Sequence, residues 1–142
     1  MSEPDAKGAS RFVVRVRYAD TDQMGFVYYG NYLRWFEVGR TEMLRELGTS
    51  YREVEAAGIR LPVLEACCRY LRPARYDDRV VIETTLAELG RASLRFGYRV
   101  LREADGELLA RGTTAHCFLD ARGRPARPPG SFLELLRRSS AR

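Results

Sequence analysis

The segment 18–32, which reads YADTDQMGFVYYGNY, concentrates the side chains of this chain that could do chemistry. Its two carboxylates, Asp20 and Asp22, stand one residue apart. An ionised carboxylate can act as a general base or as an oxygen nucleophile. The same spacing also occurs in turns and helix caps, because Asp side chains accept hydrogen bonds from nearby backbone N–H groups. The two carboxylates alone therefore leave a catalytic and a structural role open.

A long helix is predicted directly after this segment, over residues 31–47. Apolar side chains recur there at helical spacing, and Gly48 follows as a suitable C-terminal cap. Gly39 lies in the middle of the apolar stripe, which predicts that the helix backbone approaches a sheet closely there. The N-terminus of a buried helix presents unpaired N–H groups and about half a unit of positive charge. We therefore expect a dry pocket at this helix start, beside the two carboxylates.

The remaining elements follow from changes of period along the chain. A second, shorter helix is predicted over 49–58, with Thr49 or Ser50 as its cap. Alternating apolar and polar residues predict strands elsewhere. These strands are expected at 11–18, 59–72, 79–89, 92–103 and 107–120. The order indicates an α+β fold, an antiparallel sheet of these five strands wrapped around one long central helix. Its long edge strands favour pairing with a second subunit.

The net charge of +5 is confined to the end of the chain. Residues 122–142 hold six arginines and one glutamate, whereas the other residues hold 18 basic and 18 acidic side chains, which balance. A nucleic-acid-binding domain would carry a basic face on its folded body. We therefore expect no nucleic-acid partner, and the basic tail is either solvated or in contact with the phosphates of a ligand.

Cysteine, histidine and hydropathy narrow the class of protein further. Three cysteines, two of them adjacent, make a poor disulfide framework and indicate a reducing, cytoplasmic location. The single histidine, His116, offers no cluster for a metal and lies within a predicted strand, which favours a core residue over a general base. No apolar run has the roughly 20 residues of a membrane span. The N-terminus lacks the apolar region of a secretory signal.

The motif Y-x-D-T-D-x-x-G-x-V-Y-x-x-N-Y, followed by W-F-E-x-x-R, resembles the acyl-CoA thioesterases of the hot-dog fold. The resemblance is strongest to the branch of 4-hydroxybenzoyl-CoA and YbgC-like thioesterases. It implies a hot-dog domain at 11–128, whereas composition predicts a flexible N-terminus at 1–10 and a basic C-terminal tail at 129–142 that can form a short helix. It also implies hydrolysis of an acyl- or aroyl-CoA thioester by a homodimer that assembles into a tetramer, without a metal or a cofactor.

The resemblance implies roles for the polar positions of the motif. Asp22 corresponds to the catalytic carboxylate, and Tyr18 to a tyrosine near it. The backbone N–H of Tyr29 corresponds to the donor that stabilises the oxyanion. Asn31 corresponds to a residue that holds the loop or orients water.

Substrate binding is expected at two places. Gly25, Val27 and Tyr28 of the motif are expected to contact the substrate. Coenzyme A carries phosphates, which arginine side chains bind well. The arginines expected to bind them are Arg91, Arg122 and Arg124.

Several alternatives stay open at this point. Asp22 either attacks the thioester carbonyl, which gives a mixed anhydride, or activates a water molecule as a base. The thiol carrier is either coenzyme A or acyl carrier protein, since both present the same pantetheine arm. A non-catalytic relative would bind acyl-CoA as a ligand sensor and would not need Asp22. Glu37 and Arg40, one helical turn apart, are expected to form an ion pair.

Overall fold

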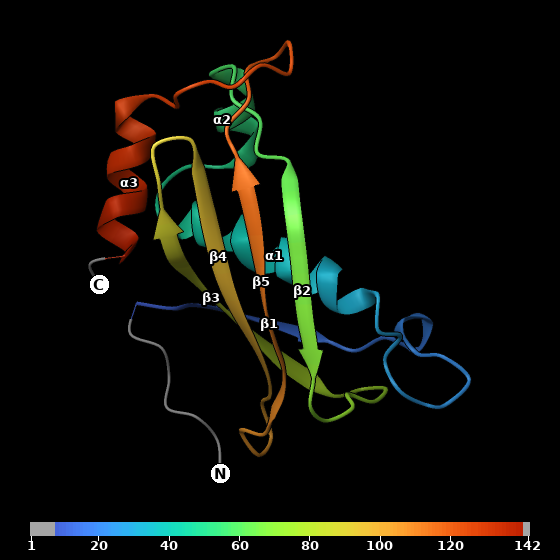
Figure 1. Ribbon diagram of the computed structural model, residues 1–142. Helices are drawn as coiled ribbons and strands as arrows, with labels where there is room; N and C mark the ends of the chain where they lie inside the picture. Colours follow the sequence, from blue (N-terminus) through green and yellow to red (C-terminus); the bar gives the residue numbers. More distant parts are fainter. Residues whose placement is uncertain (1–7, 141–142) are drawn as a thin grey trace.

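The computed structural model of the protein describes residues 8–140, which contain one five-stranded sheet. Its strands are β1 (Ser10–Arg15), β2 (Val63–Tyr70), β3 (Arg79–Leu89), β4 (Ser93–Arg102) and β5 (Leu108–Cys117). Every pairing is antiparallel, and the strand order is β1-β3-β4-β5-β2 (Figure 1). β1 and β2 are therefore the edges of the sheet. Residues 1–7 of the segment predicted to be flexible lie outside the described range.

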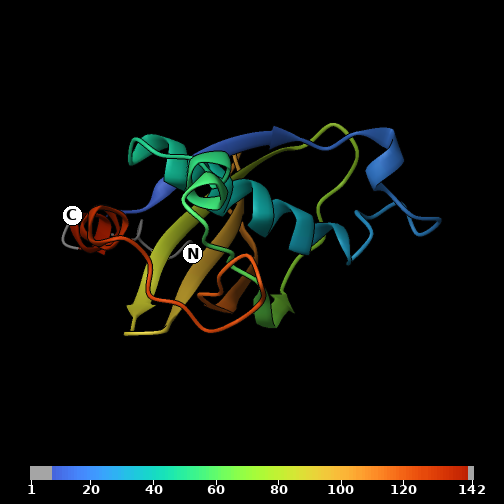
Figure 2. The same ribbon diagram turned by 90° about the horizontal axis from the view of Figure 1, so that it is seen from above.

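The long helix α1 (Asn31–Glu46) crosses one face of this sheet, as Figures 1 and 2 show. Its buried side chains include Trp35, Phe36 and Leu44, which form the core together with the facing side chains of the sheet. The ring of Phe36 stacks on that of Tyr98 in β4, with a centroid separation of 4.3 Å. This confirms the prediction of an antiparallel sheet around one long helix.

Gly39 is a point of close approach between α1 and the sheet. A Cβ atom at this position would lie 2.3 Å from Thr84 Oγ1 and 2.8 Å from Ile82 Cγ2, two side chains of β3. Because atoms do not approach so closely, a larger residue would force the helix or β3 to move. The close contact predicted at Gly39 is confirmed, and it fixes the depth at which α1 lies on the sheet.

Two shorter helices flank the sheet. α2 (Tyr51–Ala56) is capped by Ser50, whose Oγ accepts a hydrogen bond of 3.2 Å from the N–H of Glu53. α3 (Gly130–Ser140) forms within the basic tail and packs beside β3, where Leu136 is fully buried (Figure 1). No helix in the described part of the chain is long and apolar enough to cross a membrane.

The strand predicted at 11–18 is shorter in the structure. β1 ends at Arg15, and Tyr18–Asp20 forms a short 3₁₀ helix. The N–H of Arg17 donates a hydrogen bond of 2.8 Å to the carboxylate of Asp20, which closes this turn and prevents the strand from continuing.

The ion pair predicted between Glu37 and Arg40 is wrong. Arg40 is buried, and its Nε donates to the hydroxyl of Tyr51 at 3.2 Å. Glu37 is exposed, and no ion pair joins it to Arg40 within residues 8–140. Helical spacing places the two side chains on neighbouring positions of α1, but the guanidinium of Arg40 is buried and bonds to Tyr51 instead.

Candidate active site

The loop at 21–30, which precedes α1, is closed by hydrogen bonds of its own backbone. The N–H of Asp22 donates to the carbonyl of Phe26 at 2.8 Å. Between them Gly25 has a φ of +83°, a conformation that favours glycine, and its N–H donates to the carbonyl of Asp22 at 3.0 Å. Asp22 is therefore held at a fixed position just before the helix.

The two carboxylates of the motif have different surroundings. Asp20 is buried and accepts hydrogen bonds from the backbone N–H of Arg17 at 2.8 Å and from its guanidinium at 3.0 Å. Burial alone would raise the pKa of Asp20, but the hydrogen bonds from Arg17 keep this pKa below its usual value. Asp22 Oδ1 accepts the N–H of Met24 at 2.9 Å, and Oδ2 has no hydrogen-bond partner among the described residues. Asp20 is thus structural, whereas Asp22 keeps an oxygen that can react.

Asp22 lines a pocket of about 280 Å³ at the N-terminus of α1. The 21–30 loop also contributes Val27 and Tyr29, and the first turn of α1 contributes Tyr32. Another wall comes from the end of β2 and the residues after it, 70–73. Most of the lining is apolar or aromatic with few polar groups, which is typical of a pocket that binds an organic ligand.

The first peptide groups of α1 direct their N–H groups out of the helix end. The carbonyl of Tyr28 accepts the N–H of Asn31 at 2.9 Å, and the carbonyl of Tyr29 accepts the N–H of Tyr32 at 3.2 Å. In a trans peptide the N–H points opposite to the carbonyl, so the N–H groups of Tyr29 and Gly30 point outward. Neither has an acceptor in the part of the chain that the structure describes. These donors and the helix dipole favour a negatively charged oxygen.

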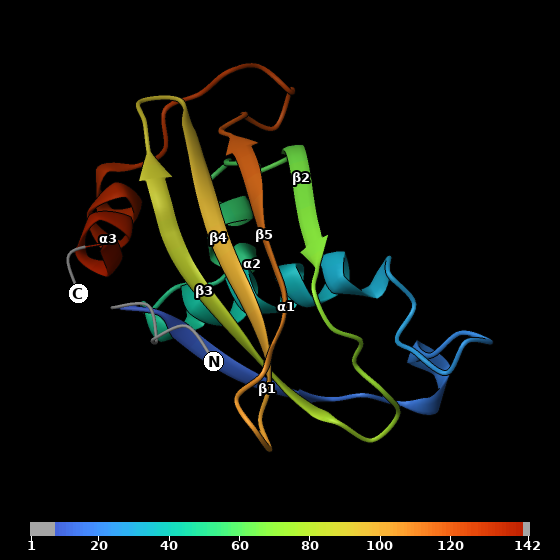
Figure 3. The ribbon, with the colours of Figure 1, turned by 60° about the horizontal axis from the view of Figure 1, so that its bottom comes forward.

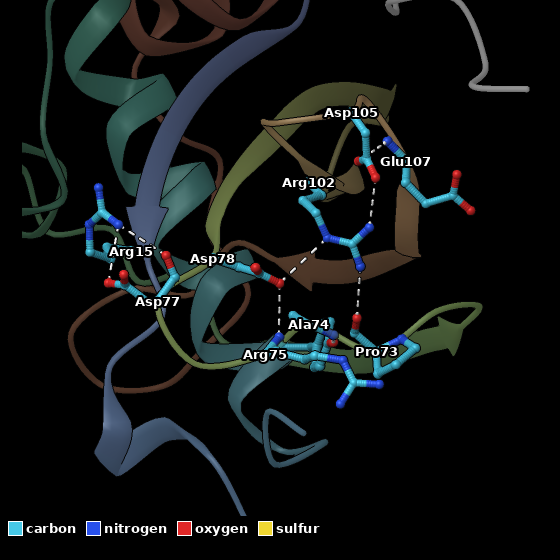
Figure 4. Close-up of polar contacts among 10 residues, drawn as sticks. Arg15, Pro73, Ala74, Arg75, Asp77, Asp78, Arg102, Asp105 and Glu107 are labelled. Carbon is cyan, nitrogen blue, oxygen red and sulfur yellow. Dashed lines mark hydrogen bonds and ion pairs between the residues drawn. The ribbon is translucent and has the colours of Figure 1, made fainter. Parts of the chain in front are cut away.

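A network centred on Arg102 holds the segment 71–78, which carries part of the pocket wall (Figure 4). The guanidinium of Arg102 donates to the carbonyl of Pro73 at 3.2 Å. It also donates to the carboxylates of Asp78 at 3.5 Å and Asp105 at 2.9 Å. Two of these acceptors, Pro73 and Asp78, belong to the segment, which Arg102 thus ties to β4, while Asp105 holds the guanidinium in place from the turn after β4.

Ala74 connects this segment to the other pocket walls. Its carbonyl accepts the N–H of Val27 at 2.9 Å, and its N–H donates to the hydroxyl oxygen of Tyr32 at 3.4 Å. The walls of the pocket are thus joined by hydrogen bonds, although they come from distant parts of the sequence.

Three of the predicted site residues, Asp22, Val27 and Tyr29, line the same pocket. Asn31 is the first residue of α1, and its side-chain amide donates to the carbonyl of Asp20 at 2.8 Å. Its predicted role of holding the loop therefore has a direct hydrogen bond behind it. Gly25 lies in the exposed turn of the loop.

Tyr18 and Tyr28 do not line the pocket. Tyr18 is 78% exposed, and its ring meets that of Tyr76 edge to face. Tyr28 is 46% exposed and packs on the ring of Tyr29 with a centroid separation of 4.6 Å. No hydrogen bond joins either side chain to Asp22 within residues 8–140, and their predicted roles stay predictions.

The turn between β3 and β4, which contains Arg91, lies far from the loop before α1, as Figure 3 shows. Arg91 lines a hollow of about 210 Å³ together with Arg127 and Arg137. Three guanidinium groups around one hollow are suited to a ligand with several negative charges.

Arg122 and Arg124 do not line this hollow. They are exposed in a turn that the carboxylate of Asp120 closes by accepting their backbone N–H groups at 2.8 Å and 3.0 Å. Their side chains extend from the surface, and their predicted contact with phosphates stays a prediction.

His116 is fully buried, as predicted for a core residue. Its Nε2 lies 2.7 Å from Thr114 Oγ1 and its Nδ1 lies 3.3 Å from the carbonyl oxygen of Leu61. Burial lowers the pKa of His116, which favours the neutral ring. His116 does not line the pocket of Asp22.

Tyr70 and Arg72 line the pocket but were not among the predicted site residues. Tyr70 is the last residue of β2, and Arg72 follows it. Their positions depend on where β2 ends relative to α1, so only the strand order could have indicated them.

Comparison with known proteins gives one consistent result. A family model described as "Thioesterase-like superfamily" matches residues 16–136. The acyl-CoA thioester hydrolase YbgC of Escherichia coli O6:H1 is 37% identical over 99 residues, which cover 70% of this chain and 73% of YbgC.

Solved structures agree with this match. The hypothetical protein TT1821 from Thermus thermophilus is 41% identical, with a TM-score of 0.85, over 90% of this chain and 97% of TT1821. The DHNA-CoA thioesterase from Staphylococcus aureus is 31% identical, with a TM-score of 0.88, over 94% of this chain and 91% of that enzyme. The chain therefore belongs to the thioesterase-like superfamily, which confirms the predicted hot-dog fold and the prediction of a thioester hydrolase.

Proposed function

We propose that this thioester hydrolase cleaves acyl-CoA into a free acid and coenzyme A, and that Asp22 is its catalytic carboxylate. One observation supports this assignment above the others. Asp22, which has one carboxylate oxygen without a partner in the described residues, lines the same pocket as Tyr29, whose backbone N–H points out of the start of α1. A thioester carbonyl bound between Asp22 and Tyr29 would have a carboxylate oxygen beside its carbon and N–H donors beside its oxygen.

The chemistry needs both parts. When an oxygen attacks the thioester carbon, negative charge develops on the carbonyl oxygen, and fixed N–H donors stabilise it without reorganising. Loss of one such donor typically lowers kcat by about 10²–10³-fold. The N–H groups of Tyr29 and Gly30 are proposed for this role because both are free to donate within the described residues.

Asp22 can act in either of two balanced ways. As a nucleophile, its oxygen bonds to the thioester carbon, the coenzyme A thiolate leaves, and water then cleaves the mixed anhydride to regenerate the carboxylate. As a base, it takes a proton from a water molecule that attacks the same carbon, and that proton goes to the departing thiolate. Label in the Asp22 carboxylate after a single turnover in ¹⁸O-labelled water would establish the anhydride with water attack at the Asp22 carbon, since the base route labels only the released acid.

The function is tested by release of free thiol from a panel of acyl-CoA thioesters that vary in chain length and include benzoyl-type groups. We expect turnover of at least one thioester, and Asp22→Asn is expected to lower kcat by about 100-fold or more while acyl-CoA still binds. Equal rates for the two proteins would exclude Asp22 as the catalytic group. Binding without turnover by the unmodified protein would instead favour a ligand sensor.

The arginine hollow supports coenzyme A as the thiol carrier. Arg91, Arg127 and Arg137 line it, and the nucleotide of coenzyme A carries several phosphate charges. We assign these three side chains to phosphate binding, with the exposed Arg122 and Arg124 as further contacts. Acyl carrier protein remains the alternative carrier.

A homodimer that pairs through β2 is part of the proposal. β2 is an edge of the sheet, and its side chains Val63 and Leu64 are 46% and 64% exposed. Leu33 of α1, 42% exposed, lines one groove with Val63, so the apolar surface continues onto the helix. An exposed apolar edge strand is a template for pairing with another chain. A second copy of this protein is the proposed partner, and a tetramer of two dimers stays a prediction.

Light scattering tests this interface. The unmodified protein should have twice the 16.2 kDa mass of one chain, or a larger multiple. Leu64→Arg on β2 should reduce that mass, whereas Val13→Arg on the other edge, β1, should not. A monomeric protein, or the same loss from both variants, would contradict an interface at β2.

The free thiols of Cys67, Cys68 and Cys117 support the proposed cytoplasmic location.

A further inference from the structure

Tyr70 connects the edge strand β2 to the first turn of α1. Its hydroxyl donates a hydrogen bond of 2.9 Å to the backbone carbonyl of Tyr29. Its ring meets the ring of Tyr32 edge to face at 5.0 Å and that of Tyr29 at 6.4 Å. All three tyrosines line the pocket of Asp22. One side chain of β2 thus contacts both the backbone and the rings at the start of the helix.

The hydrogen bond acts on the peptide group that follows Tyr29. This peptide is planar and trans, so the direction of its carbonyl also sets the direction of the Gly30 N–H. Within α1 the same carbonyl accepts only the N–H of Tyr32, at the longer distance of 3.2 Å. The hydroxyl of Tyr70 therefore provides the shorter of its two bonds, and a donor on the carbonyl also polarises the N–H of the peptide.

The peptide group before Tyr29 is fixed separately, since the carbonyl of Tyr28 accepts the N–H of Asn31 at 2.9 Å. Tyr29 is therefore held on both sides, by the helix on one and by Tyr70 on the other. Partial burial raises the pKa of Tyr70, which keeps its hydroxyl in the protonated form that can donate.

We propose that Tyr70 is a positioning residue of the thioesterase: by holding the Tyr29 carbonyl it aims the N–H of Gly30 at the oxyanion, beside the N–H of Tyr29 that the helix fixes. This inference rests on the proposed function of those N–H groups. It adds a residue from a different strand to the site and explains why the pocket is built against the end of β2.

Tyr70→Phe tests the proposal because it removes only the hydroxyl. A contact that matters mainly in the transition state should lower kcat and kcat/KM together, by about 3- to 10-fold, and leave KM unchanged. Tyr76→Phe is the matched control. Tyr76 is 58% exposed, its ring contacts Tyr18, and its hydroxyl has no hydrogen-bond partner in the described range. Introducing 3-fluorotyrosine at position 70, a stronger donor, should keep or raise kcat.

Amide hydrogen exchange tests the same point without turnover. Tyr70→Phe should speed exchange of the Tyr32 N–H, which shares the Tyr29 carbonyl, and Tyr76→Phe should not. Unchanged kcat and unchanged exchange would overturn the role of Tyr70, as would a change confined to KM. A protein that hydrolyses no acyl-CoA but shows the exchange effect would overturn the proposed function and retain the contact.

Discussion

The side-chain amide of Asn31 donates a hydrogen bond of 2.8 Å to the backbone carbonyl of Asp20, which ties the first residue of α1 to the strand side of the 21–30 loop. Asp22 follows two residues after the accepting carbonyl. The backbone N–H of Asn31 also donates to the carbonyl of Tyr28, at 2.9 Å. Asn31 therefore sets the position of the carboxylate relative to the N–H donors at the helix start.

Asn31→Ala should lower kcat by about 10-fold and reduce the free energy of unfolding by about 1 kcal/mol, the usual net value of one hydrogen bond. The loop then loses its connection to α1, while the Asp22 carboxylate itself is unchanged. Steady-state kinetics and urea denaturation measure the two effects. A variant that loses stability but keeps kcat would restrict Asn31 to the fold.

Asp20 and Asp22 should respond in opposite ways to the same substitution. Asp22→Asn is expected to abolish most of the activity, by about 100-fold or more, with little change in melting temperature. Asp20→Asn weakens the bonds from Arg17 that close the 3₁₀ turn, so it should lower the melting temperature and keep most of kcat. Thermal melts and thiol release, measured on both variants, decide the matter. The reverse pattern would assign catalysis to Asp20.

Arg91→Ala should raise KM for acyl-CoA by about 5- to 10-fold, as expected from the loss of a charged contact worth about 1 kcal/mol. KM for the matching acyl-pantetheine, which lacks the nucleotide, should not change. Arg52→Ala, a substitution of an exposed arginine on α2, is the control. Equal effects on both substrates would remove the phosphate role of the arginine hollow.

His116 should make the protein less stable in mild acid. Burial lowers the pKa of His116 in the folded chain, whereas the unfolded chain has the ordinary value of 6.5. As the pH falls through 6.5, His116 binds a proton in the unfolded chain before it does so in the folded chain. The free energy of unfolding therefore has its highest value above this pH, as far as His116 is concerned, and decreases below it. His116→Gln, which can still bond to Thr114, should show a weaker decrease between pH 7 and pH 5 in urea denaturation. Identical pH profiles would contradict the buried neutral ring.

Local patterns were sufficient to predict most elements of the fold. The apolar stripe and Gly48 bounded α1 to within one residue of its observed end at Glu46. The strand predicted at 79–89 has the same limits in the structure. Gly39 indicated a close approach to the sheet because glycine destabilises a helix interior, so its place within the apolar stripe points to packing that leaves no room for a side chain. These features depend on neighbours in sequence, which periodicity reports directly.

The parts of the site that the sequence did not predict depend on strand order. Tyr70 reaches Tyr29 because β2 is an edge strand that ends beside the start of α1. Arg102 supports the pocket wall from β4, at a position that periodicity describes only as strand. The motif marked the loop of Asp22 but gave no information on which strand ends would surround it.

The hydrogen bond between Val27 and Ala74 has a consequence for how the protein folds. It joins segments that lie on either side of α1, α2 and β2 in the sequence, so the chain must close a long loop before the bond can form. Such non-local contacts form more slowly than helices, because the chain loses the entropy of closing the loop before the contact stabilises it. A refolding chain should therefore regain its helical circular dichroism before it regains thiol-releasing activity, and a nascent chain that has reached only β2 should be inert.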